Sequence, residues 1–330
     1  MILRDELYKL VWSKPMTQVG EQFGVSGSYM KRVCVSLNVP RPGLGYWAKL
    51  AVGKAPSPTP LPEAQPGDTL FWSQAGQVAP PPKPQPPKIQ RKRQPKISIP
   101  RDHIHSLIRG AKGHFEHTRP SRDSAYLKPY KRLLVDITTS EACLDKSLSF
   151  ANEVFNALES AGYRVVLAPS GEALHGTAID EREKRTKEQG YYHPRRIWSP
   201  DRPTVAYLGS VAIGLSIIEM SEEVTMRYVN GEYIRDSDYV APKLSRYSAD
   251  RTWTTTQELP TGRLRLMAYS PYRRVDWVSE WEEDREGQLA PMIKSIVRSL
   301  ELAAIELVQK IEEAERQAEI AHQKWLIEED

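Results

Sequence analysis

The sequence predicts an α+β protein with a small helical N-terminal part and a larger mixed part that ends in a long helix. Proline makes up 13 of the 46 residues from 55 to 100, a composition that cannot build a hydrophobic core. Residues 1–54 show only helical patterns, whereas residues 101–330 start with helices and continue into several alternating, β-branched segments. We therefore expect an N-terminal domain over 1–54, a Pro-rich and largely disordered linker over 55–100, and an α+β domain over 101–330.

The N-terminal segment begins with a short amphipathic helix over residues 4–13, which ends before Pro15. Its inward side chains are Leu7, Leu10 and Val11. Two prolines and two glycines within residues 38–49 exclude a regular element there. We expect Tyr46 and Trp47 to fold back instead as a hydrophobic lid on the small domain.

Residues 17–37 contain two short helical patterns joined by a turn. Gly20 is small where two crossing helices approach closely, and Gly24 supplies the positive φ that the turn needs. Ser26 is placed as an N-cap, since its hydroxyl can accept from the free N–H groups of the second helix. That helix has an apolar stripe of Met30, Val33, Cys34 and Leu37. Its opposite face carries Gly27, Ser28, Tyr29, Lys31, Arg32 and Ser36.

This spacing over residues 16–38 is similar to the bacterial helix-turn-helix pattern, although the family more often has alanine where this chain has Gly20. The resemblance implies a small all-α domain that binds double-stranded DNA, with the second helix in the major groove. The implied DNA-binding residues are Ser26, Ser28, Tyr29, Lys31 and Arg32. The alternative is an ordinary helical hairpin whose Lys31 and Arg32 are simply solvated.

Charge is unevenly distributed, and the N-terminal third is basic. Residues 1–54 hold eight Lys/Arg and three Asp/Glu, residues 55–100 hold six and two, and residues 101–330 hold 32 and 37. Release of counter-ions from a nucleic-acid backbone favours binding by such a basic segment. Further candidate DNA-binding residues are therefore Arg41, which suits a minor groove, and the basic run of Lys88, Arg91, Lys92 and Arg93. The alternative for that run is a solubilising linker.

The larger domain starts with helical patterns over 102–117 and 141–161, the second capped by Ser140 and ended by Gly162. An apolar run at 133–137 lies between them. The remaining expected strands are 164–168, 177–183, 204–208, 211–219, 225–233 and 263–269. Asn230-Gly231 is a strong signal for a two-residue hairpin.

The C-terminal segment is one long helical pattern that begins near Pro291 and runs to the end of the chain. Apolar residues from Ile293 to Ile311 keep an a/d-like spacing. We expect this stripe to hold a homodimer through residues 101–330. The alternative is that it packs on its own domain.

We expect no catalytic role. The chain has no glycine-rich phosphate loop, nucleophile elbow or zinc-protease helix motif, and no cofactor or metal is implied. The alternative is a magnesium-dependent DNA nuclease that uses Asp136, Asp180, Glu181, Glu183 and Lys184. Glu181 and Lys184 are three residues apart at the end of the expected strand 177–183 and would face opposite sides, so a solvated strand end is favoured.

The chain has no apolar run of transmembrane length and no secretory signal, so we expect a cytoplasmic protein with no membrane contact. Cys34 and Cys143 are too far apart to indicate a disulfide framework or a zinc site. The sequence as a whole favours a transcriptional regulator or a DNA-recognition component of a mobile-element or defence system.

Overall fold

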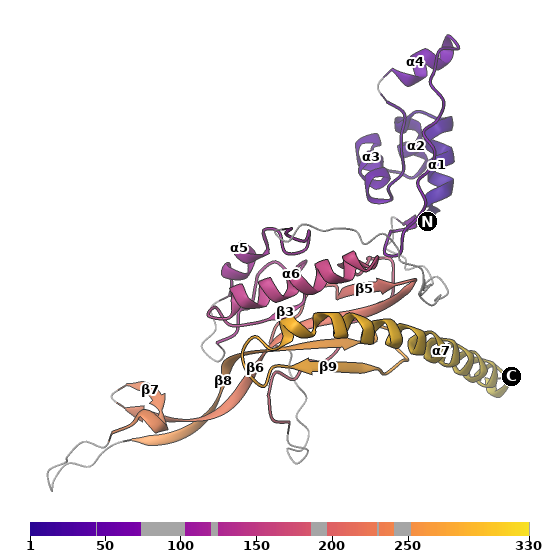
Figure 1. The fold of residues 1–330 in the computed structure, drawn as a ribbon. Helices are drawn as coiled ribbons and strands as arrows, with labels where there is room; N and C mark the ends of the chain where they lie inside the picture. The colour runs from indigo at the N-terminus through magenta and orange to yellow at the C-terminus, as the bar shows by residue number, and fades with distance from the viewer. Residues whose placement is uncertain are drawn as a thin grey trace, which may run out of the picture.

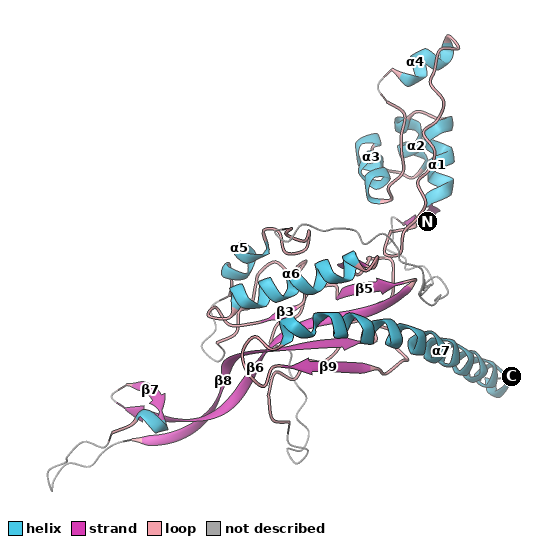
Figure 2. Ribbon diagram, viewed as in Figure 1, coloured by secondary structure: helices cyan, strands magenta, loops and turns pink. Residues whose placement is uncertain are grey.

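A computed structural model describes residues 1–43, 45–73, 103–119, 125–185, 197–229, 231–240 and 252–329. The protein is α+β: helices make up the N-terminal unit, and a seven-stranded sheet with covering helices makes up the larger one (Figures 1 and 2). Within the described residues, none of the helices combines the length and apolar character needed to cross a membrane.

Three helices of the N-terminal unit surround one small core, and a fourth short helix follows them. They are α1 (Arg4–Ser13), α2 (Met16–Gln22), α3 (Gly27–Ser36) and α4 (Tyr46–Ala51). The core consists of Ile2, Leu7, Val11, Val19, Met30, Val33, Cys34, Leu37 and Val39. The first three helices lie where their apolar spacing predicts them, because each stripe has only this core to fill.

Helix α4 corrects the expectation that residues 38–49 hold no regular element. Gly45 adopts φ +78°, and the chain restarts a helix directly after it. Tyr46 is buried and lies edge-on to Trp12, with ring centroids 5.2 Å apart. Tyr46 therefore packs on the domain, as expected, but from a helix, whereas Trp47 contacts the Tyr46 ring.

Residues 55–73 belong to the N-terminal unit and extend it beyond residue 54. Strand β2 (Phe71–Trp72) pairs antiparallel with β1 (Ile2–Leu3), and Leu61 packs on the small core. The expected linker therefore has an ordered first part, because its few apolar residues pack against β1 and the small core. The basic run of Lys88, Arg91, Lys92 and Arg93 lies outside the described residues.

The larger unit is a mixed sheet in the order β4-β5-β6-β8-β9, with β3 and β7 paired to β6. Its strands are β3 (Ile137–Thr138), β4 (Arg164–Leu167), β5 (Thr204–Leu208), β6 (Val211–Val229), β7 (Glu232–Arg235), β8 (Trp253–Tyr269) and β9 (Val278–Glu282). Only the β3–β6 pairing is parallel among these strands. Its helices are α5 (Ala111–Glu116), α6 (Leu144–Ser160), the short 3-10 turn η1 (Asp236–Asp238) and α7 (Leu289–Glu329).

Helices α6 and α7 cover one face of this sheet and share its main core (Figure 1). The irregular chain after β4 contributes to the opposite face, where Ile179 packs with Ile218 and Met267. Strands β6 and β8 continue past the sheet as a long two-stranded ribbon that carries β7 near its end.

Several expected elements differ in the structure. The strands expected at 211–219 and 225–233 join into β6 through a bulge between Glu219 and Ser221. The expected hairpin then connects β6 to β7, with Val229 paired to Glu232. Residues 177–183 form no named strand, and their only described pairing is an isolated bridge from Arg182 to Ser221. Their alternating pattern reflects burial against the sheet rather than membership in it.

The helical expectations for the larger unit hold only in part. Within the range expected to be helical, residues 103–117 form an irregular start, turns and the short α5, which begins after Gly110 with φ +73°. Helix α6 starts at Leu144, three residues later than expected. The Ser140 hydroxyl donates to Glu219 and accepts from the Cys143 amide at 3.4 Å, so it closes the turn before the helix. Helix α7 runs from Leu289 to Glu329, close to the expected range.

The apolar stripe of α7 lies in the core of its own domain. Ile293, Ile296, Leu300, Leu307 and Ile311 are all buried against the sheet and α6. The surface from which we expected a homodimer is thus occupied within one protomer. The later part of α7 projects beyond the sheet (Figure 1).

Candidate nucleic-acid interface

Two glycines and one serine fix the crossing of α2 and α3. A Cβ on Gly20 would lie 2.6 Å from the carbonyl oxygen of Val25, so the helices could not approach this closely with a larger residue. Gly24 adopts φ +64° in the connecting turn. The Oγ of Ser26 accepts from the Tyr29 amide at 3.1 Å and starts α3. The close contact with the turn therefore explains why position 20 holds a glycine.

The other end of α3 is held by a buried arginine. Arg4 is 4% exposed, and its guanidinium donates to the carbonyl oxygens of Leu37 at 2.7 Å and Asn38 at 3.0 Å. A third bond reaches the Pro62 carbonyl oxygen at 2.9 Å. A cation at a helix C-terminus is electrostatically favourable, and the fork of Arg4 also ties residue 62 to the helix.

The exposed face of α3 carries most of the residues expected to contact DNA. Ser28, Tyr29, Lys31 and Arg32 are all exposed, together with Ser36 and Val35. The guanidinium of Arg32 lies over the Tyr29 ring, 5.2 Å from its centroid. Ser26 is exposed too, but its hydroxyl is used by the cap, and Arg41 is exposed on the loop that follows.

Trp72 is a neighbour of this face that sequence reasoning missed. Its ring lies 6.0 Å from Phe23 of the turn and 6.0 Å from Tyr29 of α3, measured between centroids. The apolar island at 68–72 is visible in the sequence, but nothing local indicates that it pairs with β1. The position of Tyr29 therefore depends on a residue more than 40 positions away.

The same segment joins the N-terminal unit to the sheet. The Asp68 carboxylate receives a bond from Arg164 of β4 at 2.7 Å, and Arg164 also donates to the Pro66 carbonyl oxygen. A Cβ on Gly171 would meet the Phe71 ring at 2.8 Å, so the two units are in close contact there. Burial by itself raises the pKa of Asp68, but bonds from the Gln65 amide and Arg164 outweigh it, so the pKa lies below its ordinary value.

The lowered pKa of Asp68 predicts a pH-dependent contribution to stability. A group whose pKa falls on folding stabilises the folded state above its unfolded pKa, and that contribution is lost as the pH falls through the folded value. We expect Asp68→Asn to be less stable than the wild type at neutral pH, and the difference to shrink as the solution is acidified below about pH 4. Denaturant unfolding across this range measures the difference, and a difference that stays constant would contradict the prediction.

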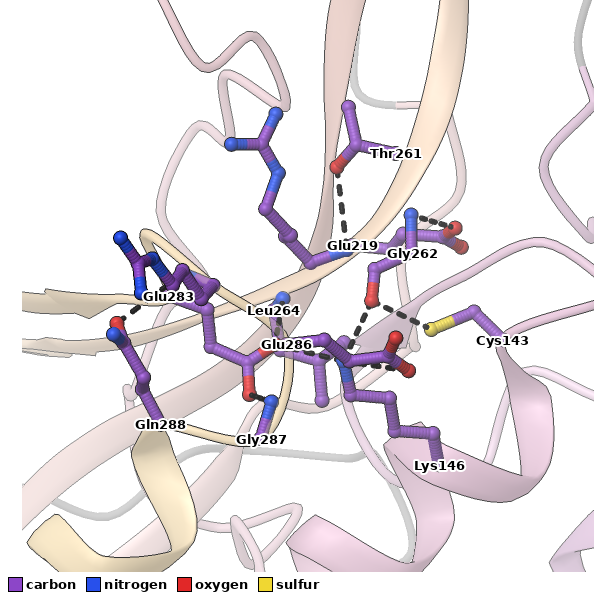
Figure 3. Close-up of polar contacts among 12 residues, drawn as sticks. Cys143, Lys146, Glu219, Thr261, Gly262, Leu264, Glu283, Glu286, Gly287 and Gln288 are labelled. Carbon is purple, nitrogen blue, oxygen red and sulfur yellow. Dashed lines mark hydrogen bonds and ion pairs between the residues drawn. The ribbon is translucent and has the colours of Figure 1, made fainter.

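A buried polar cluster lies between α6, β6 and the start of α7 (Figure 3). Glu219 is 1% exposed and accepts from the backbone amides of Ser140 at 2.6 Å and Gly262 at 3.0 Å. Its carboxylate also accepts from the Ser140 and Thr139 hydroxyls. Lys146 donates to the Gly262 carbonyl oxygen and to Glu283.

This cluster has the character of a structural network. Burial first, and the nearby Glu219 charge second, raise the pKa of the Cys143 thiol, so it stays protonated and is a poor nucleophile. The carboxylates of Glu219 and Glu283 both receive hydrogen bonds from the surrounding chain. The network joins the bulged part of β8 at Gly262 to helix α6 and to the segment before α7.

The residues expected for the alternative nuclease site do not form one site in the structure. Asp180 pairs with Arg182 at 2.8 Å, and Glu183 is bonded to Arg263. Lys184 is exposed. Asp136 is buried elsewhere and accepts from the Ser216 hydroxyl. Glu181 is buried, which raises its pKa.

Arginine partners therefore occupy the carboxylates of Asp180 and Glu183. Among the described residues, no three His, Cys, Asp or Glu side chains are grouped so that they could hold a metal ion. The chain matches no protein-family model, no curated protein and no solved structure in the three comparisons with known proteins.

Proposed function

We propose that this protein binds double-stranded DNA sequence-specifically, with α2 and α3 acting as a helix-turn-helix and α3 entering the major groove. The observation that carries the proposal is the two-sided character of α3. Met30, Val33 and Cys34 fill the core, and the exposed face presents hydroxyl, aromatic and basic side chains without a carboxylate. A short, capped helix with that face fits the width and the negative potential of the major groove.

Each exposed residue type has a chemical role in this proposal. Arg32 and Lys31 suit the O6 and N7 acceptors of guanine, and Ser28 can bond to either kind of base edge. The exposed Val35 suits contact with a thymine methyl group. The first N–H groups of α3, next to Gly27, suit a phosphate oxygen, and Arg41 suits a phosphate or the minor groove.

The regulator and the DNA-recognition component of a mobile-element or defence system are both forms of this proposal. Both require an N-terminal unit that recognises a DNA sequence and a second unit with a separate role. The carboxylates named for a nuclease are paired with arginines or lie apart, so we propose no catalytic step.

Affinity measurements on a duplex selected from a random library test the proposal. We expect Arg32→Ala to weaken binding to the selected site by about 1–3 kcal/mol, the worth of one bidentate bond to a base. Lys9→Ala is the matched control, since Lys9 is an exposed cation of the same unit that lies on α1 and not on α3. Equal affinities for the wild type and Arg32→Ala would show that α3 is not the reading helix.

A further inference from the structure

The first thirty residues of the larger unit carry a charge opposite to that of the rest of the unit. Residues 103–132 contain seven Lys/Arg and two Asp/Glu, whereas residues 133–330 contain 24 Lys/Arg and 34 Asp/Glu. An acidic surface repels a DNA backbone, so the basic exception is the part of this unit that DNA can approach.

The chain brings three of these basic residues, Arg119, Lys128 and Lys131, together next to α5. An isolated antiparallel bridge joins Thr118 to Pro129, and the Arg119 amide donates to the Lys128 carbonyl oxygen at 3.0 Å. Residues 119 and 128 thereby become cross-strand neighbours. Lys131 reaches back to α5, where its ammonium donates to Nε2 of His114 at 3.1 Å.

An exposed aromatic ring organises the patch. Tyr130 is 49% exposed, and the Arg119 guanidinium lies over its ring at 5.3 Å from the centroid. The His117 ring packs against the same tyrosine at 5.1 Å. The guanidinium is thus oriented by a ring instead of by a carboxylate, and its N–H groups stay available for an external acceptor.

The pairing of charges differs between this patch and its borders. Lys112 pairs with Asp145 at 2.6 Å and Arg132 pairs with Asp201 at 3.1 Å, so these flanking charges are locally compensated. Within the described part of the chain, neither Arg119 nor Lys131 has a carboxylate partner. Arg119 and Lys131, which have no paired carboxylate in this part of the chain, therefore lie beside two histidine rings and Lys128.

We propose that the patch formed by His114, His117, Arg119, Lys128, Tyr130 and Lys131 binds the phosphodiester backbone of the duplex held by the N-terminal unit. The inference rests on the proposed function, and it adds binding that is blind to sequence. Guanidinium, ammonium and imidazole groups donate to phosphate oxygens, and such bonds position a duplex while bonds to bases select it. The two units lie on one chain, so binding of DNA by the N-terminal unit raises the effective concentration of DNA at the patch.

The salt dependence of binding tests the patch on the full-length protein. The variant is Arg119→Gln/Lys128→Gln/Lys131→Gln, and the probe is a duplex of random sequence, about 40 base pairs long, which exceeds the few helical turns that such a protein covers. Its matched control is Arg273→Gln/Arg274→Gln/Lys294→Gln, which removes three exposed cations outside the patch. We expect the slope of log affinity against log salt to fall by about 2.7 in the patch variant, or about 0.9 for each phosphate that is no longer neutralised. The control should keep the wild-type slope.

Two results separate this inference from the proposed function. The patch variant should lose affinity equally for the selected site and for random duplex, whereas Arg32→Ala should lose the preference between them. A patch effect without an Arg32 effect would support the patch and contradict the reading helix. A patch variant that keeps the control's slope would overturn the inference. The inference would also be overturned if the patch bound polyglutamate, an acidic polypeptide, and its substitution left the DNA slope unchanged.

Discussion

Replacing Glu219 by alanine is expected to lower the free energy of unfolding of the sheet domain by about 3 kcal/mol or more. The carboxylate accepts from two backbone amides, those of Ser140 and Gly262, and from the Ser140 and Thr139 hydroxyls. Each buried donor left without an acceptor costs about 1–3 kcal/mol, and bonds to a charged group are the stronger kind. Urea unfolding followed by circular dichroism measures the change.

The control for Glu219 is Glu223, which lies four residues further along β6 and is exposed. Glu223→Ala is expected to change stability by less than about 0.5 kcal/mol, as surface substitutions usually do. If Glu219→Ala is as stable as Glu223→Ala, the cluster in Figure 3 does not stabilise the domain.

Replacing Arg4 by alanine is expected to destabilise the N-terminal unit by about 3 kcal/mol, because three carbonyl oxygens would have no donor. A unit of about 70 residues buries little surface and has little stability to spare. We therefore expect the N-terminal unit to melt at a lower temperature. Under the proposed function, its DNA affinity should fall with the folded fraction. Arg4→Lys should not restore stability, since one ammonium cannot reproduce the fork to three acceptors.

Calorimetry of Arg4→Ala, Arg4→Lys and Lys9→Ala measures this, with Lys9→Ala as the surface control on the same helix. A wild-type melting temperature in Arg4→Ala would mean that other interactions hold the end of α3. A lower melting temperature with unchanged DNA affinity would separate the fold of the unit from its proposed binding role.

The elements that sequence reasoning located are those with local causes. Helix α3 needs only a capping serine, a turn glycine and an apolar stripe, all within residues 24–37. The hairpin between β6 and β7 likewise needs only its two central residues. Local signals of this kind agree with the tertiary packing here, so the element positions could be predicted.

The elements that it missed have distant causes. Strand β2 exists because Phe71 and Trp72 pair with residues 2 and 3, which no spacing in either segment reveals. The strand expected at 177–183 has the right alternation, but it meets β6 only through the bridge at Ser221, between the parts of that strand that pair with β3 and with β7. The stripe on α7 predicts a buried face without indicating whether the sheet or a second chain buries it.

The candidate site divides in the same way. The exposed residues of α3 follow from helical spacing, whereas the packing of Tyr29 on Trp72 depends on the β1–β2 pairing. The patch around Tyr130 could not be predicted from the sequence, for a different reason. Its positive charge is averaged into the acidic total of residues 101–330. Its members come together through the bridge between Thr118 and Pro129 and through the contacts of Lys131 and Tyr130, which no local spacing reveals.

Selection from a random duplex library, carried out in parallel on the wild type and on Arg32→Ala, tests the proposed DNA recognition most directly. We expect the wild type to select one defined motif. Arg32→Ala should select the same motif with one or two base positions relaxed, because only the bonds from that side chain are removed. No enriched motif with the wild type, or an identical motif with every position equally strict in the variant, would contradict sequence reading by α3.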